Sequence, residues 1–354
     1  AFLANRHFVD FAGSTVVHAT GAWVSLAGCL VLGPRIGRFG TDGRPNRIAG
    51  HSTVIATAGT LLIFFGWLGF NGGSTFEANA AVGGIVANTV LAGAAGGAAG
   101  YLLCLRGDGV TYPEHILYGL LGGLVAITAG CHLLTPGGAI LMGALGGGAA
   151  IGTNAFIERR FRIDDALGVI GIHGVAGIVG TIGLAFLAPV ERLPAGGRLA
   201  QFDIQALGAM VNFLWVFCIS YILFRLLDAV RPIRVSAADE ERGLNQSEHA
   251  SAIGLGGMEH TLERIVRGTA DLGARLPVLV GEETERLTRL FNAFLDNLET
   301  NELQHRSIEE ARRASQEAER LTTLADAASE GILLLAEGRI RDANPAAQRG
   351  TMNV

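Results

Sequence analysis

Long stretches without a charged side chain limit most strongly what this chain can fold into. Each stretch is long enough for a helix of about 20 residues, the length that crosses a bilayer. Charged residues make up only 17% of the 354 residues, whereas a soluble domain carries roughly 25%. Glycine occurs 51 times, and small residues let helices approach closely in a membrane. We therefore predict an all-α polytopic membrane protein with spans in Phe11–Pro34, Ile48–Phe76, Ala78–Leu105, His115–Ile157, Ala166–Val190 and Ile204–Phe224.

The longest of these stretches, His115–Ile157, is expected to hold two spans. About 43 residues in a single helix would far exceed the bilayer thickness. The proline and paired glycines of Thr135–Gly138 break a helix, so the turn between the two spans is predicted there. The sequence thus predicts seven spans.

The loops between the predicted spans differ in arginine content, which sets the orientation of a membrane protein. Arginines occur in the alternate loops Arg35–Arg47 (four), Arg106–Glu114 (one) and Glu158–Asp165 (three), and again from Arg225 onward. The other loops hold none (Asn71–Glu77 and Leu133–Gly138) or two (Glu191–Asp203). We expect the first three loops and the part from Arg225 onward to face the cytoplasm, because basic residues are retained on that side. With seven spans, Ala1 lies outside and the C-terminus inside. The predicted location is the inner (plasma) membrane.

One pattern, D-x-x-G-x4-H, occurs in two predicted spans that run in opposite directions. It extends from Asp10 to His18 in the first span and from Asp165 to His173 in the sixth. Repeats of opposite orientation place a substrate site near the bilayer midplane. Eight residues rise about 12 Å along a helix, so the two histidines reach similar depths from opposite faces of a core about 30 Å thick. An ionisable side chain in lipid is costly and usually faces a pathway.

A single histidine in a span is a hydrogen-bonded core residue about as often as it is part of a site. Two histidines at matched depth favour a site. Asp10 and Asp165 are instead expected to have a structural role, accepting hydrogen bonds from the free N–H groups of the first helical turn. We expect Trp67 to serve in packing.

The four cysteines stand alone in apolar sequence, so neither a disulfide nor a metal site is predicted. No cofactor is expected, and a net charge of −5 gives no reason to expect nucleic acid.

Several segments resemble the Amt/Mep/Rh ammonium transporter family. Asp10–His18 (DFAGSTVVH) and Asp164–Gly177 (DDALGVIGIHGVAG) are similar to the two histidine-bearing helices of that family. Gly66–Ser74 (GWLGFNGGS) and Gly122–Cys131 (GGLVAITAGC) are similar to other spans, and Glu241–His249 (ERGLNQSEH) resembles the cytoplasmic C-terminal segment. Family members have eleven spans in an inverted-repeat fold. The resemblance therefore implies that this chain holds the fifth to the eleventh and that further spans precede it.

The resemblance also implies roles for individual residues. His18 and His173 are similar to twin histidines whose imidazoles meet edge to edge in the pore. Phe70 is similar to one of two stacked phenylalanines at the outer mouth, and Ser74 to a hydroxyl that accepts a hydrogen bond from ammonium. Gly168 departs from the pattern, because many members carry an aspartate there. The implied partners are ammonium or ammonia, the lipid bilayer, two further copies in a homotrimer, and a cytoplasmic signalling partner or PII-type regulator.

After the last predicted span, charged residues become frequent. We expect a membrane domain over residues 1–235 and a cytoplasmic segment over 236–253. Residues 254–298, with two helices around a Gly/Pro connector, resemble a HAMP signal-relay module; the alternative is a plain amphipathic linker. Residues 299–323 show the 3/4 apolar spacing of a coiled coil. Residues 324–354 are predicted to form helix, strand, turn and strand, and they resemble the start of a PAS domain that continues beyond this chain.

A relay, a coiled coil and a PAS start exceed what a transporter needs. We therefore hypothesise that an ammonium channel domain is the sensing input of a signalling protein. Ammonium would be recruited at an outer vestibule, and ammonia and a proton would pass along the twin-histidine pore. The alternative is an ordinary ammonium transporter with a non-signalling tail. No catalytic motif is present, so we expect no enzyme activity in this chain; a histidine kinase or nucleotide cyclase would lie beyond residue 354.

Overall fold

The computed structural model divides the chain into two compact units, Ala1–Glu248 and His249–Val354. The first unit carries the predicted spans, and the second carries most of the segment predicted to follow the membrane domain. Each unit is described separately. The structure describes residues 2–50, 52–106, 112–249, 262–267, 273, 275, 276, 278, 285–328, 330–337 and 339–351.

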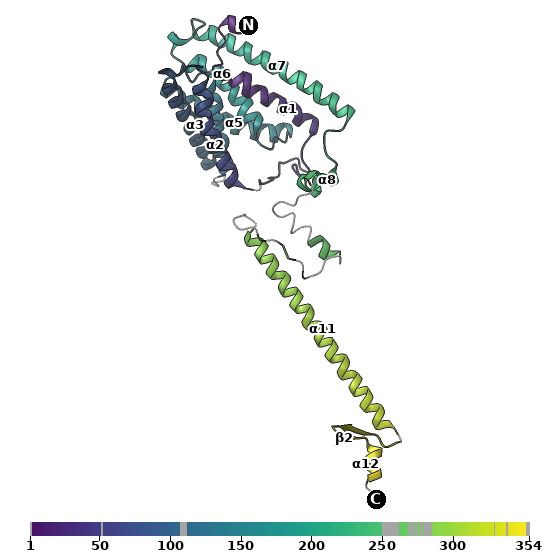
Figure 1. Ribbon diagram of the computed structural model, residues 1–354. Coiled ribbons are helices and arrows are strands. Elements are labelled where there is room, and N and C mark those ends of the chain that lie inside the picture. The colour runs from purple at the N-terminus through teal and green to yellow at the C-terminus, as the bar shows by residue number, and fades with distance from the viewer. Residues whose placement is uncertain are drawn as a thin grey trace. The chain divides into compact units, whose positions relative to one another are not determined.

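The first unit is a bundle of apolar helices joined by loops (Figure 1). Its helices are α1 (Thr20–Leu32), α2 (Thr53–Gly73), α3 (Ala81–Arg106), α4 (Pro113–Thr128), α5 (Pro136–Phe161), α6 (Ala176–Leu187), α7 (Arg198–Val230), α8 (Ala237–Arg242) and α9 (Leu244–His249). Two π-helical turns, η2 (Ser14–Ala19) and η3 (Ile170–Val175), lead into α1 and α6, and 3-10 turns lie at Ala4–Arg6 and Val190–Arg192.

Six helical segments in the described residues are long and apolar enough to cross a membrane, counting η2 with α1 and η3 with α6. The predicted double span does form two helices, α4 and α5. Pro136 occupies the first turn of α5, where its missing N–H is not needed. However, α4 already ends at Thr128 after 16 residues, so the connection begins earlier than the predicted turn. The count of seven spans therefore remains a prediction that depends on α4.

Glycine allows the middle of this unit to pack backbone against backbone. A Cβ on Gly96 of α3 would collide with the Gly119 carbonyl of α4, and a Cβ on Gly143 of α5 would collide with the Ala92 carbonyl of α3. A Cβ on Gly147 would lie 2.7 Å from the Gly96 carbonyl oxygen. Close approach of this kind increases dispersion contacts, which drive helix association where lipid removes the hydrophobic effect. The three helices α3, α4 and α5 thus form the tightly packed centre.

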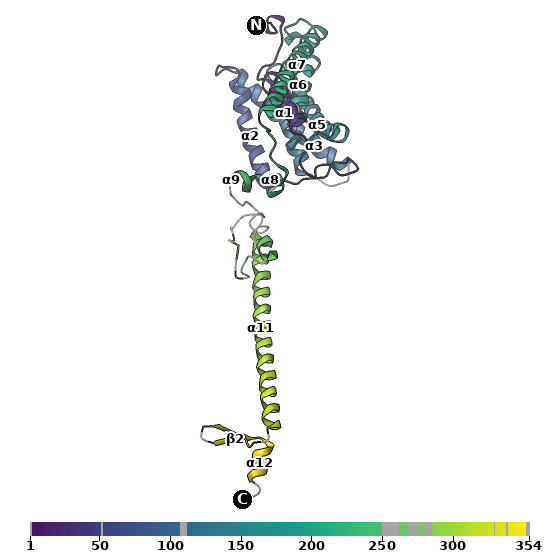
Figure 2. The same cartoon turned by 90° about the vertical axis from the view of Figure 1, so that its right-hand side faces the viewer.

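The outer helices present apolar side chains to the surroundings. Figure 2 shows α2 at the edge of the unit, where it packs against α3, and α1 packs along α7. Phe65 of α2 is 76% exposed and Trp215 of α7 is 70% exposed. Large apolar surfaces of this extent are unfavourable in water, whereas lipid accommodates them. The unit therefore has the surface of a multi-pass membrane protein.

The second unit contains a long helix followed by a hairpin. Its elements are α11 (Glu285–Ala327), β1 (Leu333–Ala336), β2 (Arg339–Ala343) and α12 (Pro345–Thr351). The two strands pair antiparallel, with an irregularity between Leu334 and Leu335. The Asn344 side chain joins the hairpin to α11, because its amide donates to the carbonyl oxygens of Ala325 (2.8 Å) and Glu330 (3.0 Å). Strand, turn and strand thus lie where the alternating pattern predicts them.

Helix α11 is continuous across the predicted boundary between the relay (254–298) and the coiled coil (299–323). Most of residues 254–284 lie outside the described residues, so the first helix and connector of the HAMP-like relay remain predictions. The described part of that connector contacts α11. Leu276 N–H donates to the Asn292 side chain (3.0 Å), and the Asn292 amide donates back to the Leu276 carbonyl (2.9 Å).

Replacing Gly143 by alanine is predicted to destabilise the first unit by about 1–3 kcal/mol, the usual cost of overpacking. The added Cβ would press on the backbone of α3 at Ala92. Gly148→Ala in the same helix is the matched control, since nothing lies within 4 Å of a Cβ at that position. The measurement is the thermal unfolding midpoint in detergent. Equal midpoints for the two variants would show that α3 and α5 do not pack this closely.

Candidate functional site

Both histidines of the repeated pattern lie on a π-helical turn at the start of a span. His18 belongs to η2 and His173 to η3, and each turn continues directly into an α-helix. The glycine before each turn has a positive φ, 105° at Gly13 and 68° at Gly168, a conformation that disfavours other residues. A π-turn carries one more residue than an α-turn and is common at functional sites. The repeat therefore builds the same local structure twice.

The aspartates of the repeat supply hydrogen-bond acceptors to these turns. Asp10 Oδ2 accepts from the backbone N–H groups of Thr15 (3.0 Å) and Val16 (2.8 Å). Asp165 Oδ2 accepts from the N–H group of Ile170 (2.7 Å). The first N–H groups of a helix have no partner within it, so a carboxylate at this place fixes where the turn begins. Both aspartates lie where a structural role at a helix start requires them.

The two imidazoles meet in the interior of the first unit. The ring centroids of His18 and His173 are 5.3 Å apart, and their planes differ by 22°. His18 Nε2 is buried and has no hydrogen-bond partner among the described residues. A buried polar atom without a partner is costly and calls for an explanation. This nitrogen can accept from, or donate to, a small polar solute that reaches the two rings.

Two aromatic side chains of α2 lie against His18. The Trp67 indole stacks on the imidazole, with centroids 4.8 Å apart and planes 15° apart, and the Phe70 ring centroid is 5.6 Å from it. Sequence reasoning assigned Trp67 to packing and missed this contact. Its spacing was an available signal, because residues three positions apart, such as Trp67 and Phe70, share one helix face. Trp67 therefore joins the site.

Ser74 lies just beyond the last residue of α2, one turn after Phe70. Its hydroxyl donates to the Phe70 carbonyl oxygen at 2.8 Å, which leaves the hydroxyl oxygen free to accept a hydrogen bond. The Phe70 side chain is 39% exposed. The two predicted vestibule residues thus lie together at one end of a single helix, and Phe70 also reaches the imidazole of His18.

Buried polar residues hold the segment that leads into η2. The Gln205 side chain accepts from the Val9 N–H group (2.8 Å) and donates to the Val9 carbonyl (2.6 Å), as a neighbouring strand would. The hydroxyls of Thr15 and Thr181 are 2.6 Å apart and share a hydrogen bond. Gln205 is fully buried, and losing its partners there would cost about 1–3 kcal/mol. These contacts fix the turn that carries His18 to the helices that follow His173.

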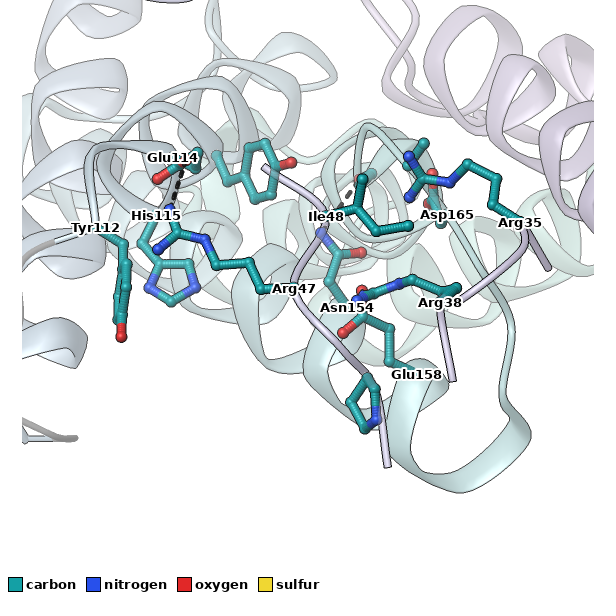
Figure 3. Close-up of a pocket in the computed structure, with 14 residues that line it drawn as sticks. Arg35, Arg38, Arg47, Ile48, Tyr112, Glu114, His115, Asn154, Glu158 and Asp165 are labelled. Carbon is teal, nitrogen blue, oxygen red and sulfur yellow. Dashed lines mark hydrogen bonds and ion pairs between the residues drawn. The ribbon is translucent and has the colours of Figure 1, made fainter. Parts of the chain in front are cut away.

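The three arginine-bearing loops meet at one end of the first unit, around a cavity of about 300 Å³ (Figure 3). Each arginine in the cavity wall is paired with a carboxylate: Arg35 with Asp164, Arg38 with Glu158 and Arg47 with Glu114. The first pair is bidentate, with both contacts at 2.8 Å, which is the strong geometry for guanidinium and carboxylate. The pairs join the loop after α1 to the segment before η3, to the end of α5 and to the start of α4.

Gly168, which departs from the family pattern, also lines this cavity. A side chain at this position would collide with the Asn154 amide. Asn154 Oδ1 in turn accepts from the Gly171 N–H group at 3.2 Å. The glycine therefore makes room for a side chain that helps to fix the turn carrying His173.

The segment after α7 is bound to the loop after α1. We call residues 231–249 the tail segment. Arg234 donates to the Leu32 carbonyl (2.6 Å) and pairs with Glu240 (2.7 Å). Glu240 also accepts from the Ile36 N–H group (2.7 Å). The residue that precedes Ile36 is Arg35, which binds Asp164. One short loop therefore contacts both the tail segment and the residues that lead into η3, the turn that carries His173.

No group of three or more His, Cys, Asp and Glu side chains within the described ranges could hold a metal ion. What the site offers is two imidazoles, an indole, a phenyl ring and a hydroxyl. Fold and site together define a polytopic helical membrane protein in which two oppositely directed histidine turns meet.

The ammonium transporter family model matches residues 1–253, and a PAS domain model matches residues 319–350. The chain therefore belongs to the ammonium transporter family, with the start of a PAS domain fused to it; neither is a catalytic domain.

Individual relatives support this assignment. The Synechocystis protein sll0537, named as a candidate ammonium transporter, is 38% identical over 312 residues, 87% of this chain and 57% of that protein. Ammonium transporter Amt2 of Archaeoglobus fulgidus is 38% identical over 255 residues, 69% of this chain and 54% of the relative. A solved structure described as "Sensor Amt Protein" superimposes with a TM-score of 0.68 at 38% identity, covering 70% of this chain and 62% of that one. The chain spans less than two thirds of each.

Acid is predicted to release the tail segment from the loop after α1. The N–H group of Ile36 and the guanidinium of Arg234 hold the pKa of Glu240 below its ordinary value. Burial raises the pKa of Asp164, but the hydrogen bonds from Arg35 outweigh burial and lower that pKa overall. A carboxyl with a lowered pKa favours the bound state above its ordinary pKa, and this contribution is lost as pH falls through the lowered value. Binding should be complete above the ordinary carboxyl pKa of about 4 and should weaken progressively as pH falls below it.

The measurement is the electron paramagnetic resonance distance between spin labels at Arg44 and Arg242, followed from about pH 7 to pH 3. The Glu240→Gln variant is the control, because it lacks the titrating carboxylate and should show a weakened contact at every pH. A distance in the unsubstituted protein that stays constant down to pH 3 would contradict this account of the contact.

Proposed function

We propose that this chain is the ammonium-sensing input of a signal-transduction protein, with His18 and His173 forming its solute site in an apolar pore. The observation that carries the proposal is the meeting of two imidazoles from oppositely directed turns, beside a buried ring nitrogen without a partner. Imidazoles supply hydrogen bonds without fixed charge, and they accept and pass on a proton. Such a pair suits ammonia and its proton.

Phe70 and Ser74 would recruit ammonium before it reaches the histidines. A bare cation is expensive to move into hydrocarbon, so part of its hydration must be replaced at the entrance. An aromatic face offsets about 1–2 kcal/mol through cation–π attraction when desolvated, and the Ser74 oxygen can accept an N–H group. Both residues lie at one end of α2, and Phe70 contacts His18. This supports an ordered transfer from vestibule to imidazole pair.

The tail segment would receive the signal through the loop after α1. His173 lies on η3, whose first turn is held by Asp165, and the adjacent Asp164 binds Arg35. The next residue, Ile36, holds Glu240 of the tail segment. A shift of η3 on ammonium binding would thus reach the tail through one carboxylate, one guanidinium and one backbone amide. The coupling requires ammonium to bind the two states with different affinity.

Two observations favour sensing over an ordinary transporter with a non-signalling tail. The chain carries a PAS match at residues 319–350, and a neighbour in structure is described as a sensor. On this proposal the membrane part works as a homotrimer in the inner (plasma) membrane, with the C-terminus in the cytoplasm. The relay would act on an output domain or on a PII-type regulator there. Deletion of everything after residue 254 separates the two functions, because only a sensor loses its output.

Replacing His18 or His173 by glutamine is predicted to reduce ammonium-evoked responses of the full-length protein by at least about tenfold, since amides cannot take up a proton. The measurement is current on solid-supported membranes together with ammonium binding in nanodiscs. His132→Gln is the control, because His132 stacks on Phe11 away from the pair. Responses that are unchanged in both glutamine variants would refute the assignment of the imidazoles.

Glu240→Gln is predicted to leave ammonium binding intact while reducing the signalling output at least about tenfold, because the Ile36 N–H group of the loop then loses its charged acceptor in the tail segment. The control is Glu248→Gln, which changes an acidic residue of the same segment that has no ion pair in the described residues. Output is read as activity of the full-length protein at increasing ammonium. Equal loss of binding and output in the Glu240 variant would mean that the tail supports the site instead of reading it.

A further inference from the structure

The Trp67 indole, which stacks on His18, is held at its N–H edge by a single hydroxyl. Trp67 Nε1 donates to Thr128 Oγ1 at 2.9 Å. The same hydroxyl donates to the Leu124 carbonyl at 2.7 Å, so its proton is used and its oxygen faces the indole as the acceptor. Thr128 is completely buried. The indole N–H group therefore has a fixed partner in a place that water does not reach.

Thr128 also lies at the junction between α4 and the segment that leads into η2. Its carbonyl oxygen accepts from the Ala12 N–H group (3.1 Å), and the Ala129 carbonyl accepts from the Phe11 N–H group (3.0 Å). One turn earlier, the Val125 carbonyl accepts from the Ser14 hydroxyl at 2.7 Å. The end of α4 is thus joined to the backbone that carries His18 and, through the Thr128 hydroxyl, to the ring that stacks on His18.

We propose that Thr128 is a positioning residue: its hydroxyl fixes the Trp67 indole, and the indole fixes the angle at which His18 faces His173. The inference rests on the proposed function of the imidazole pair. The three contacts form a continuous series, from hydroxyl to indole (2.9 Å), from indole to the first imidazole (4.8 Å), and from there to the second (5.3 Å). Because His18 Nε2 has no partner among the described residues, stacking takes the place of a hydrogen bond in holding this ring.

A threonine that served only in packing would behave differently from one that positions the indole. Valine has nearly the same shape, but it cannot accept the indole N–H group, which would remain buried and unsatisfied. The indole would rotate to find another partner for this N–H group, and the imidazole of His18 would then lose the ring that holds it in place. Serine keeps the acceptor and loses only a methyl group. The pair Thr128→Val and Thr128→Ser therefore separates hydrogen bonding from volume.

The chain contains a close structural counterpart for use as a control. Thr89 is also fully buried, its hydroxyl donates to the carbonyl four residues earlier (Ile85, 2.8 Å), and it accepts from a side chain of α2 (Asn71 Nδ2, 3.0 Å). The two threonines thus share the same local hydrogen-bond pattern. Neither Thr89 nor Asn71 makes a hydrogen bond or a ring contact with either imidazole in the part of the chain that the structure describes. Thr89→Val should therefore carry the general cost of the substitution alone.

The experiment uses the full-length protein in lipid nanodiscs with ammonium chloride as the probe. Calorimetry measures ammonium affinity, and ¹⁵N nuclear magnetic resonance of labelled histidines reports the two imidazoles directly, without ammonium. Thr128→Val is expected to weaken ammonium binding about tenfold, the usual order of effect when the partner that orients a ligand group is removed. It should also shift the His18 resonance, whereas Thr128→Ser and Thr89→Val should resemble the unsubstituted protein.

A second variant covers the case in which Thr128→Val does not fold. Trp67→Phe keeps an aromatic ring but lacks the N–H group, and it should reproduce the loss; combining it with Thr128→Val should add nothing, since both remove one interaction. Affinity and imidazole resonances in Thr128→Val equal to those in Thr89→Val would overturn the positioning role. Failure of the unsubstituted protein to bind ammonium would instead refute the proposed function, while the imidazole resonances would still decide the role of Thr128.

Discussion

The structure of the first unit depends on placing two imidazoles side by side in a bundle that is otherwise apolar. Polar groups in such a medium are costly unless they are paired, and several polar side chains around the pair are hydrogen-bonded. Gln205 binds the backbone before His18, Thr15 binds Thr181, and Trp67 binds Thr128. His18 Nε2 has no such partner among the described residues, and its ring also lies against the imidazole of His173. A partnerless ring nitrogen beside a second imidazole is the physical reason to regard the pair as a site and not as packing.

The same repeated element connects the site with the far end of the unit. In each copy an aspartate and a glycine of positive φ precede a π-turn that contains the histidine. In the second copy, the preceding residue is Asp164, which binds Arg35 in the loop that also holds the tail segment. One local structure therefore both presents an imidazole and begins beside an ion pair with the loop after α1. This arrangement gives a sensor a short physical route from solute to tail.

Much of this could be read from the sequence, because it rests on periodicity and composition. Charge-free stretches located the helices, and the repeat located both histidines and both capping aspartates. The sequence did not reveal the π-turns, the stacking of Trp67 or the role of Asn154. These depend on tertiary contacts between residues far apart in the chain, such as Trp67 with Thr128, which no local pattern encodes. The early end of α4 was also missed, since Ala129–Leu134 carries no Asp, Glu or Arg although it is not helical.

The central claim is that ammonium at the imidazole pair changes the tail segment. Its most direct test is backbone hydrogen exchange across residues 231–249 of the full-length protein in nanodiscs, followed while ammonium occupancy is titrated. The account predicts that exchange changes with the same ammonium midpoint as occupancy, and that the change disappears when both histidines are replaced. Occupancy that rises with no change in exchange, or an exchange response that survives loss of both imidazoles, would contradict it.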